Sequence, residues 1–344
     1  MRRENQISGL VSVGEFLNSY LKKSPENFEQ KEEELYHVLR QSYIENPWFT
    51  MENQRNALKE WAILLTKEKL QQWLEKYPTN ENPKKIGLIL AGNLPLVGFH
   101  DILATVLSGN KALIKLSSKD RLIIPFIMKL WKENCEGELP FEMVDKLTDF
   151  DAVIATGSNN TARYLDYYFS KYPNIIRKNR TSIAVLSGNE SDEELKALAN
   201  DIFTYFGLGC RNVTRLFIPQ EMKLDRLFEN FIEHQDVINH NKYANNYDYN
   251  RAIYLLNKEQ FWDNNFVLLR EHDDLFSPLA VVNFSRYSDL EDVKNFISAH
   301  ENDIQAVVSQ LDLGGNTVAL GQSQKPDLLT YADNVDTMTF LTSL

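Results

Sequence analysis

Short apolar runs alternate with helical segments from residue 85 onward, and this alternation limits the possible folds of the chain more than any other feature. Seven runs rich in Ile, Val, Leu and Ala cover residues 86–90, 112–116, 152–155, 182–186, 215–218, 279–282 and 306–308. Segments with helical spacing lie between them, at about residues 95–107, 120–131, 161–169, 193–206, 221–234 and 289–300. Parallel strands need a crossover helix, and strands that are buried on both faces are apolar throughout. The sequence therefore predicts an α/β fold of parallel, doubly wound sheets.

The first 80 residues have a different character, because they are polar and rich in Glu, Lys, Gln and Asn. Apolar side chains recur there at helical spacing. They form three stripes, which are Phe16, Tyr20 and Leu21, then Leu35, Val38 and Leu39, then Leu58, Trp61, Leu64 and Leu65. These stripes predict amphipathic helices packed on the main body, and they are short for a coiled coil. Residues 77–83 contain two prolines and end this helical region.

Composition and charge exclude several classes of protein. At 344 residues the chain has enough length for about two domains. Its 37 basic and 48 acidic residues give a net charge of −11, which opposes binding to nucleic acid. No apolar run approaches the roughly 20 residues of a membrane span. We expect a cytoplasmic protein without a structural metal, because there is no signal-peptide core, no disulfide framework among two cysteines, and no metal motif among six histidines.

Four glycine-containing loops lie beside the predicted strands, in the part of an open α/β sheet where ligands bind. They cover residues 90–96, 108–118, 155–158 and 205–211. They contain neither a G-x-G-x-x-G fingerprint nor a P-loop. Each loop taken alone also fits ordinary turn or helix-cap chemistry, so only the combination is informative.

The two cysteines have different surroundings. Cys135 is flanked by glutamates, whose negative charge disfavours a thiolate, and we interpret it as a small buried side chain. Cys210 follows Gly207 and Gly209, which permit the close approach of a substrate to the backbone. The cation of Arg211 favours the thiolate form, so Cys210 is the candidate nucleophile.

In this order and spacing the four loops resemble those of the aldehyde dehydrogenase superfamily, and most closely its LuxC-like acyl-CoA reductase branch. The likeness runs from residue 85 to the end of the chain. The segment Asn-Leu-Pro that starts at Asn93 is similar to the family's Asn-Phe-Pro, which implies that the Asn93 amide helps to bind an oxyanion. The segment Gly-Leu-Gly-Cys that ends at Cys210, with Arg215 behind it, is similar to the family's Gly-Gln-x-Cys…Arg motif. This likeness implies that Cys210 is the nucleophile.

The same resemblance implies a site for a nicotinamide cofactor. The Gly-Asn pair at residues 109–110, with the lysine and serine after it, is similar to the family's adenosine-ribose segment, and residues 156–158 are similar to its Thr-Gly-Ser loop. An aspartate stands where the family has the glutamate that contacts the nicotinamide ribose. The implied cofactor-binding residues are Lys115, Ser117, Ser118, Thr156, Gly157, Ser158, Asp274 and Phe276. Residues 177–180 and 333–337 look specifically LuxC-like.

Two departures from the superfamily pattern refine the expectation. Residues 180–182, Arg-Thr-Ser, stand where ordinary aldehyde dehydrogenases carry Glu-Leu-Gly-Gly, so the glutamate that serves as base for acyl-enzyme hydrolysis is absent. Ser118 stands near the position at which NAD-preferring relatives often have a glutamate that holds the ribose 2′-OH. Because Lys115 and Lys119 lie near it in sequence, a 2′-phosphate is easier to accommodate, and we expect NADPH, with NADH as the alternative.

The resemblance implies that the protein reduces an acyl-CoA thioester, expected to be fatty acyl, to the aldehyde with NADPH through a covalent acyl-Cys210 intermediate. Two alternatives stay open. One is another oxidoreductase of the superfamily with a different acyl donor, and the other is a non-catalytic relative that acts as an adaptor. The expected partner is acyl-CoA or another acyl thioester, and the oligomeric state is left open, a homo-oligomer included.

The resemblance and the sequence pattern together divide the chain into four parts. We expect a helical N-terminal region at 1–80, a cofactor-binding domain at 81–183, a catalytic domain at 184–310, and a segment at 311–344 that returns to the core. Five apolar residues either line an acyl channel or fill the core, namely Leu94, Leu96, Phe99, Phe203 and Phe206.

Overall fold

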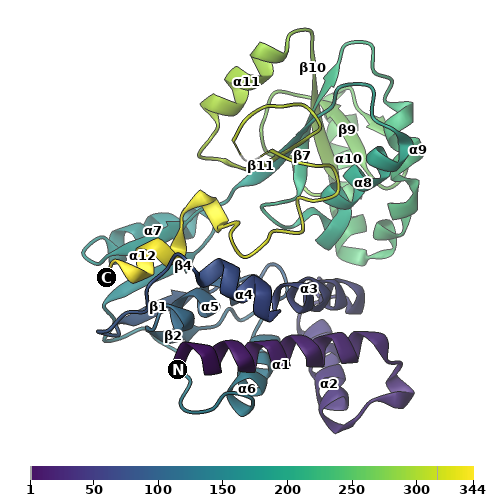
Figure 1. The fold of residues 1–344 in the computed structure, drawn as a ribbon. Coiled ribbons are helices and arrows are strands. Elements are labelled where there is room, and N and C mark those ends of the chain that lie inside the picture. Colours follow the sequence, from purple (N-terminus) through teal and green to yellow (C-terminus); the bar gives the residue numbers. More distant parts are fainter. Residues whose placement is uncertain (1, 316) are drawn as a thin grey trace. The chain divides into compact units, whose positions relative to one another are not determined.

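The computed structural model describes residues 2–315 and 317–344, and it divides into two compact units (Figure 1). Unit 1 comprises Met1–Lys178 and Asp327–Leu344, and unit 2 comprises Asn179–Pro326. Each unit contains its own sheet. Within the described residues, no helix is long and apolar enough to cross a membrane.

Unit 1 is built on a five-stranded sheet in which every neighbouring pair is parallel. The strand order is β3-β2-β1-β4-β5, with the bounds β1 (Lys85–Ile89), β2 (Lys111–Lys115), β3 (Phe141–Met143), β4 (Ala152–Thr156) and β5 (Asn174–Arg177). The connecting helices are α5 (Phe99–Leu107), α6 (Ile123–Glu133) and α7 (Asn159–Phe169). Three consecutive residues of the central strand β1 are buried, so both faces of this strand are covered and its sequence is continuously apolar.

Helices precede this sheet and share its core. They are α1 (Arg2–Lys22), η1 (Pro25–Asn27, a 3-10 turn), α2 (Gln30–Glu45), α3 (Met51–Leu64) and α4 (Lys67–Leu74). Helix α1 contacts α3 and α6, and Figure 1 shows it alongside them. Its apolar stripe of Leu10, Val13 and Leu17 is almost completely buried. The helices approach closely at Gly14, where a Cβ atom would lie 2.6 Å from the carbonyl oxygen of Leu65.

The end of the chain belongs to unit 1, as η4 (Ala332–Asn334, a 3-10 turn) and α12 (Thr337–Thr342). Helix α12 packs on α5, and the Asn110 side-chain amide donates to the carbonyl of Leu341 over 3.0 Å. A buried ion pair between Arg177 and Asp101 is also part of this contact, because Arg177 donates to the hydroxyl of Thr337 over 3.0 Å. Strand β5, helix α5 and helix α12 are therefore tied together by one polar cluster.

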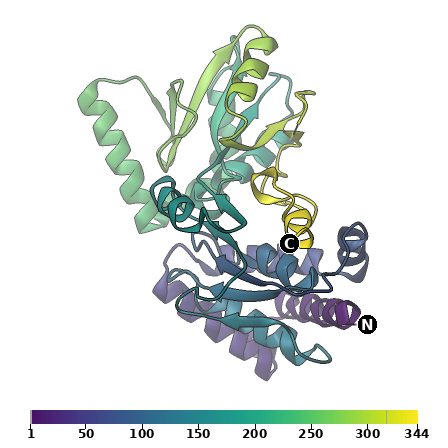
Figure 2. The same cartoon turned by 90° about the vertical axis from the view of Figure 1, so that its left-hand side faces the viewer.

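Unit 2 is built on a seven-stranded sheet that is parallel except for its antiparallel β8–β9 edge. The order is β12-β11-β6-β7-β10-β9-β8, with the bounds β6 (Thr181–Val185), β7 (Val213–Pro219), β8 (Trp262–Asp263), β9 (Leu268–Glu271), β10 (Val281–Tyr287), β11 (Ile304–Ser309) and β12 (Thr317–Val318). The helices are α8 (Asp192–Phe203), η2 (Thr204–Gly207), α9 (Asp225–Phe231), η3 (Ile232–Asn239), α10 (Asn241–Asn257) and α11 (Leu290–Ala299). Helix α10 is the long light-green helix at the margin of unit 2 in Figure 2.

The α/β fold with a helical N-terminal region is confirmed, and the structure differs from the prediction in particular elements. The helix predicted over 193–206 ends at Phe203, because Tyr205 and Phe206 have positive φ angles of 56° and 59° that a right-handed helix does not contain. Residues 221–234 form α9 and part of η3 instead of one helix. Helices α10 and α12 and the strands β3, β5, β8, β9 and β12 have no counterpart in the prediction.

Candidate active site

The first group of predicted site residues lies at the carboxyl edge of the sheet in unit 1. Ile89, the last residue of β1, pairs with Lys115 at the end of β2 and with Ala155 near the end of β4. The three loops that follow these strands therefore leave the sheet side by side. The strand ends carry Lys115 and Thr156, and the loops carry Asn93, Ser117, Ser118, Gly157 and Ser158. This edge is where open α/β sheets bind their ligands.

The loop that carries Asn93 rests on the turn after β2 at both of its ends. At one end, Gly92 lies so close to this turn that a Cβ atom would be 2.6 Å from the Cβ atom of Ser117. At the other end, the backbone N–H of Leu96, whose φ is 60°, donates to the carboxylate of Asp120 over 2.9 Å. Between these two contacts the Asn93 side chain is exposed. The backbone of the loop is thus held at both ends of the segment that carries the exposed Asn93.

Asp120 is a buried carboxylate that the sequence analysis missed. Its side chain is 1% exposed, and one carboxylate oxygen has no hydrogen-bond partner among the described residues. Burial raises the pKa of Asp120 to about 6, and the hydrogen bond from Leu96 opposes this shift. The only local signal was an acidic residue inside a predicted helix start, which is ordinary for a surface position.

The loop after β4 forms a helix start that suits an anion. The Ser158 hydroxyl accepts from the backbone N–H of Thr161 over 3.3 Å and caps α7. A Cβ atom at Gly157 would lie 2.9 Å from the Thr161 side chain, so glycine is required at this point. The first N–H groups of an α-helix attract phosphate, and Lys115, the last residue of β2, is exposed. These are the groups that the sequence predicts to bind the phosphates and ribose of a dinucleotide.

The second group lies in unit 2, where Cys210 occupies a tight turn just before β7. The backbone N–H of Gly209 donates to the side-chain oxygen of Asn212 over 2.8 Å. The carbonyl of Cys210 accepts from the hydroxyl of Ser182 over 3.1 Å, and Ser182 is fully buried in β6. Cys210 itself is half-buried and is not part of a disulfide. The backbone of the turn is therefore held from two sides, by Asn212 and Ser182, two contacts that sequence reasoning did not find.

The residues before this turn have an uncommon backbone conformation. Tyr205, Phe206 and Gly207 have φ angles of 56°, 59° and 78°, so three consecutive residues are left-handed and two of them carry aromatic side chains. Such strain costs free energy and is concentrated at functional sites. No sequence signal indicated it, since the aromatic spacing fits a helix.

The loop between β9 and β10 carries the other predicted residues of unit 2. The buried guanidinium of Arg215 on β7 donates to the carbonyl of Asp274 over 2.9 Å. The Asn283 amide donates to the carbonyls of Asp274 and Phe276 over 3.0 and 3.1 Å. Burial lowers the pKa of Arg215 below its ordinary value. Arg215, which the sequence placed behind the nucleophile, thus fixes the backbone of this loop, while the side chains of Asp274 and Phe276 are exposed.

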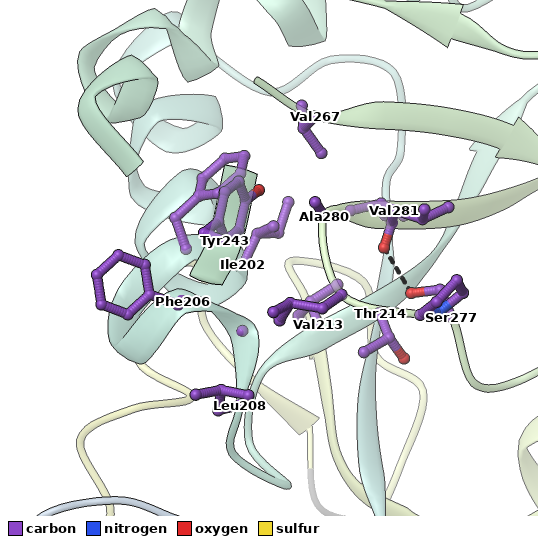
Figure 3. A pocket seen from close by; sticks show the side chains of 15 residues that line it. Ile202, Phe206, Leu208, Val213, Thr214, Tyr243, Val267, Ser277, Ala280 and Val281 are labelled. Atoms are coloured by element: carbon purple, nitrogen blue, oxygen red, sulfur yellow. Dashed lines mark hydrogen bonds between the residues drawn. The ribbon is translucent and has the colours of Figure 1, made fainter. Parts of the chain in front are cut away.

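A cavity of about 210 Å³, lined mostly by apolar side chains, lies in unit 2 beside the Cys210 turn (Figure 3). Its wall includes Phe206, Leu208, Val213 and Tyr243. Ser277 is also in the wall, and its hydroxyl donates to the carbonyl of Val281 over 2.6 Å, the dashed line in Figure 3.

The candidates for an acyl channel divide between core and cavity. Leu96 and Phe99 are buried in the core of unit 1, and Leu94 is half-buried. Phe203 is 4% exposed and Phe206 is half-buried, and both line the cavity of unit 2. The roles that the resemblance gives to the site residues of both units stay predictions.

Solved structures with this architecture define the class of protein first. Indole-3-acetaldehyde dehydrogenase AldA of P. syringae, in complex with NAD+, matches with a TM-score of 0.68 at 13% identity, over 95% of this chain and 78% of that one. Aldehyde dehydrogenase 21 of Physcomitrella patens matches with a TM-score of 0.67 at 12% identity, over 100% and 84%. The Mycobacterium tuberculosis aldehyde dehydrogenase matches with a TM-score of 0.61 at 12% identity, over 90% and 73%. The fold is that of the aldehyde dehydrogenase superfamily.

The family follows from the sequence match. The family described as LuxC acyl-CoA reductase matches residues 15–308, and the chain belongs to this family. The family and the fold together identify the protein as an oxidoreductase of aldehyde chemistry. A comparison with curated protein sequences gives no match.

Proposed function

We propose that this protein reduces an acyl-CoA thioester to the aldehyde with NADPH, through a covalent acyl-Cys210 intermediate. The observation that carries the proposal is the turn at Cys210, where a half-buried thiol follows two glycines and its backbone is held by Asn212 and Ser182. A nucleophile needs a fixed position and access for the substrate, and this turn offers both.

The first half of the reaction is acyl transfer to the protein. The Cys210 thiolate attacks the thioester carbonyl carbon, and a new C–S bond forms while the carbonyl electron pair moves to oxygen. The oxyanion accepts hydrogen bonds from the Asn93 amide and the Cys210 backbone N–H. When the carbonyl re-forms, the bond to the CoA sulfur breaks and CoA leaves as its thiolate. The acyl group is then held as a thioester of Cys210.

The second half is reduction of this thioester. A bound nicotinamide cofactor would supply the hydride. The resulting thiohemiacetal oxyanion stays with the same two donors, and the Cys210 sulfur leaves as aldehyde forms. The short stretch 180–182 contributes no carboxylate, and the Ser182 hydroxyl there donates to the Cys210 carbonyl. Without a base at that position water is not activated, so the acyl-enzyme survives until it is reduced.

The residues that would hold the cofactor lie at the carboxyl edge of the unit 1 sheet and in the 274–276 loop of unit 2. Lys115, Ser117 and Ser118 supply polar donors after β2, and Gly157 and Ser158 supply the helix start after β4. In residues 115–120 the only carboxylate is that of Asp120, which is buried and faces Leu96. No carboxylate in this segment is thus left to repel a 2′-phosphate, which supports NADPH.

The test is consumption of NADPH in the presence of saturated acyl-CoA thioesters, with release of CoA and aldehyde measured in parallel. Cys210→Ala is expected to abolish turnover and to keep cofactor binding, whereas the control Cys135→Ala is expected to stay active. NADH is measured beside NADPH and is expected to be the poorer donor. Undiminished turnover in Cys210→Ala would refute the covalent mechanism. Turnover with acyl phosphates but with no thioester would assign the protein to another branch of the superfamily.

A further inference from the structure

The apolar cavity of unit 2 bears on which acyl groups the enzyme accepts. We propose that this cavity binds the hydrocarbon chain of the acyl group, that it selects chains of about eight carbons, and that Val267 closes its far end. This inference rests on the proposed function, because it takes Cys210 as the point of attachment of the acyl group.

The position of the cavity relative to the nucleophile follows from the path of the chain. Phe206, Gly207 and Leu208 line the cavity before the Cys210 turn, and Val213 and Thr214 line it after the turn. The turn is closed by the bond from Gly209 to Asn212. Two residues span at most about 7 Å, so the backbone of Cys210 lies within that distance of the wall at Leu208. The chain thus enters the wall, leaves it at the Cys210 turn, and returns to it.

The chemistry of the wall suits methylene groups. Most of its side chains are aliphatic or aromatic, and three of them carry a hydroxyl, namely Thr214, Tyr243 and Ser277. The Ser277 hydroxyl donates to the Val281 carbonyl over 2.6 Å. The Thr214 hydroxyl lies 2.6 Å from that of Thr181 and donates to the Leu275 carbonyl over 3.2 Å. The hydroxyls of Ser277 and Thr214 therefore have partners within the protein, and the predominance of aliphatic and aromatic side chains in the wall favours an apolar ligand.

The volume limits the length of that ligand. A dry cavity of about 150 Å³ lined by aliphatic and aromatic side chains binds benzene, which has six carbons. The cavity here has about 210 Å³, which by the same proportion holds about eight carbons. Figure 3 shows Leu208 at one side of the cavity and Val267 at the opposite side. Val267 is 1% exposed, so a chain that starts near Leu208 and reaches Val267 meets packed core behind it.

Binding to a form that cannot react is the first test. The full-length Cys210→Ala protein is titrated by calorimetry with acetyl-CoA to dodecanoyl-CoA. Each buried CH2 is worth about 0.8 kcal/mol, so Kd is expected to fall about fourfold per methylene up to about eight carbons and then to level off. When Val267→Phe is added to the Cys210→Ala protein, Kd is expected to stop falling at a chain several carbons shorter. When Val267→Ala is added instead, Kd is expected to go on falling for one or two more carbons. A Kd that does not depend on chain length, or that is indifferent to Val267, overturns the assignment of the cavity.

A control variant and an activity assay distinguish a failure of the cavity assignment from a failure of the proposed function. Val293→Ala is the matched control, because Val293 is also a valine of unit 2 with 1% exposure but does not line the cavity. It is expected to leave the chain-length profile unchanged, and Val267→Ala serves if Val267→Phe does not fold. In the active protein, kcat/KM across the same thioesters is expected to follow the binding profile. If no thioester is turned over but binding still depends on Val267, the proposed function is refuted, and the assignment of the cavity as the binding site of the hydrocarbon chain stands.

Discussion

Asp120 offers a quantitative check on the electrostatics of unit 1, through the pH dependence of stability. Burial raises its pKa in the folded protein to about 6, from the ordinary 3.8. The folded state therefore binds the proton more tightly than the unfolded chain does. The stabilisation is fully present below about pH 4 and is lost as the pH rises through about 6. With these two pKa values, the free energy of unfolding falls by about 1.4 kcal/mol between pH 5 and pH 7.5 on account of this one group.

The variant Asp120→Asn removes the titration and keeps the geometry. The amide oxygen of asparagine still accepts the hydrogen bond that Leu96 donates over 2.9 Å in the wild type. Between pH 5 and pH 7.5, the free energy of unfolding of Asp120→Asn is therefore expected to fall by about 1.4 kcal/mol less than that of the wild type. Replacement of the exposed Asp145 by Asn is the control, and it is expected to leave this difference unchanged.

Urea unfolding followed by tryptophan fluorescence is the suitable assay. Four of the five tryptophans belong to unit 1, which contains Asp120, so the signal reports mainly on this unit. They are Trp48, Trp61, Trp73 and Trp131. Equal pH dependence in the wild type and in Asp120→Asn would show that the carboxylate is solvated in the folded state, and the account of its burial would be wrong.

Two further perturbations test the packing of each unit. Arg177→Met leaves the carboxylate of Asp101 buried beside Thr337 without its cation. The free energy of unfolding, measured in urea, is expected to fall by about 3–5 kcal/mol. The double variant with Asp101→Leu is expected to restore most of this loss. A loss below about 1 kcal/mol would mean that water reaches the pair. Ser191→Ala removes the cap of α8, in which the backbone N–H of Glu194 donates to the Ser191 hydroxyl over 3.2 Å. This change is expected to cost about 1 kcal/mol by thermal unfolding, whereas Ser191→Asp retains stability; equal losses in both variants would contradict the capping role.

The strands of the sheet cores could be predicted from sequence, and α10 could not, for a physical reason. A strand covered on both faces has to be apolar at every position, so β1 is visible as an uninterrupted run. The buried positions of α10 are Tyr243, Tyr247, Asn250 and Tyr254. They recur at helical spacing, but because tyrosine and asparagine carry polar atoms, they do not form a recognisable apolar stripe in the sequence. One of them shows how burial is achieved, because the Tyr247 hydroxyl donates to the carboxylate of Asp263 over 2.6 Å.

The residues of the candidate site also fall into two groups, those that the sequence indicates and those that it does not. Asn93 and Cys210, the side chains that we propose meet the substrate, stand in short motifs, and the sequence alone is enough to propose them. The side chains that hold those motifs could not be proposed in this way, because their partners are backbone carbonyls and N–H groups of distant segments. Ser182 acts on the Cys210 carbonyl from a neighbouring strand, and Asp120 acts on a backbone N–H 24 residues before it. Nothing in the local sequence of a serine or an aspartate indicates such a partner.

The end of α8 explains why the Cys210 turn has the shape it has. A helix leaves its last carbonyls without partners inside the helix, and when they are buried some donor has to reach them. The left-handed pair Tyr205 and Phe206 stops the chain from continuing α8, so the carbonyls of Asp201 and Ile202 at its end, and that of Thr204 just after it, lie within reach of Asn212. The amide of Asn212 donates to all three, over 3.2, 3.2 and 2.8 Å, and its oxygen accepts from the N–H of the glycine before Cys210. One buried side chain thus ends the helix and closes the turn, so the strain before the turn is linked to the position of the thiol.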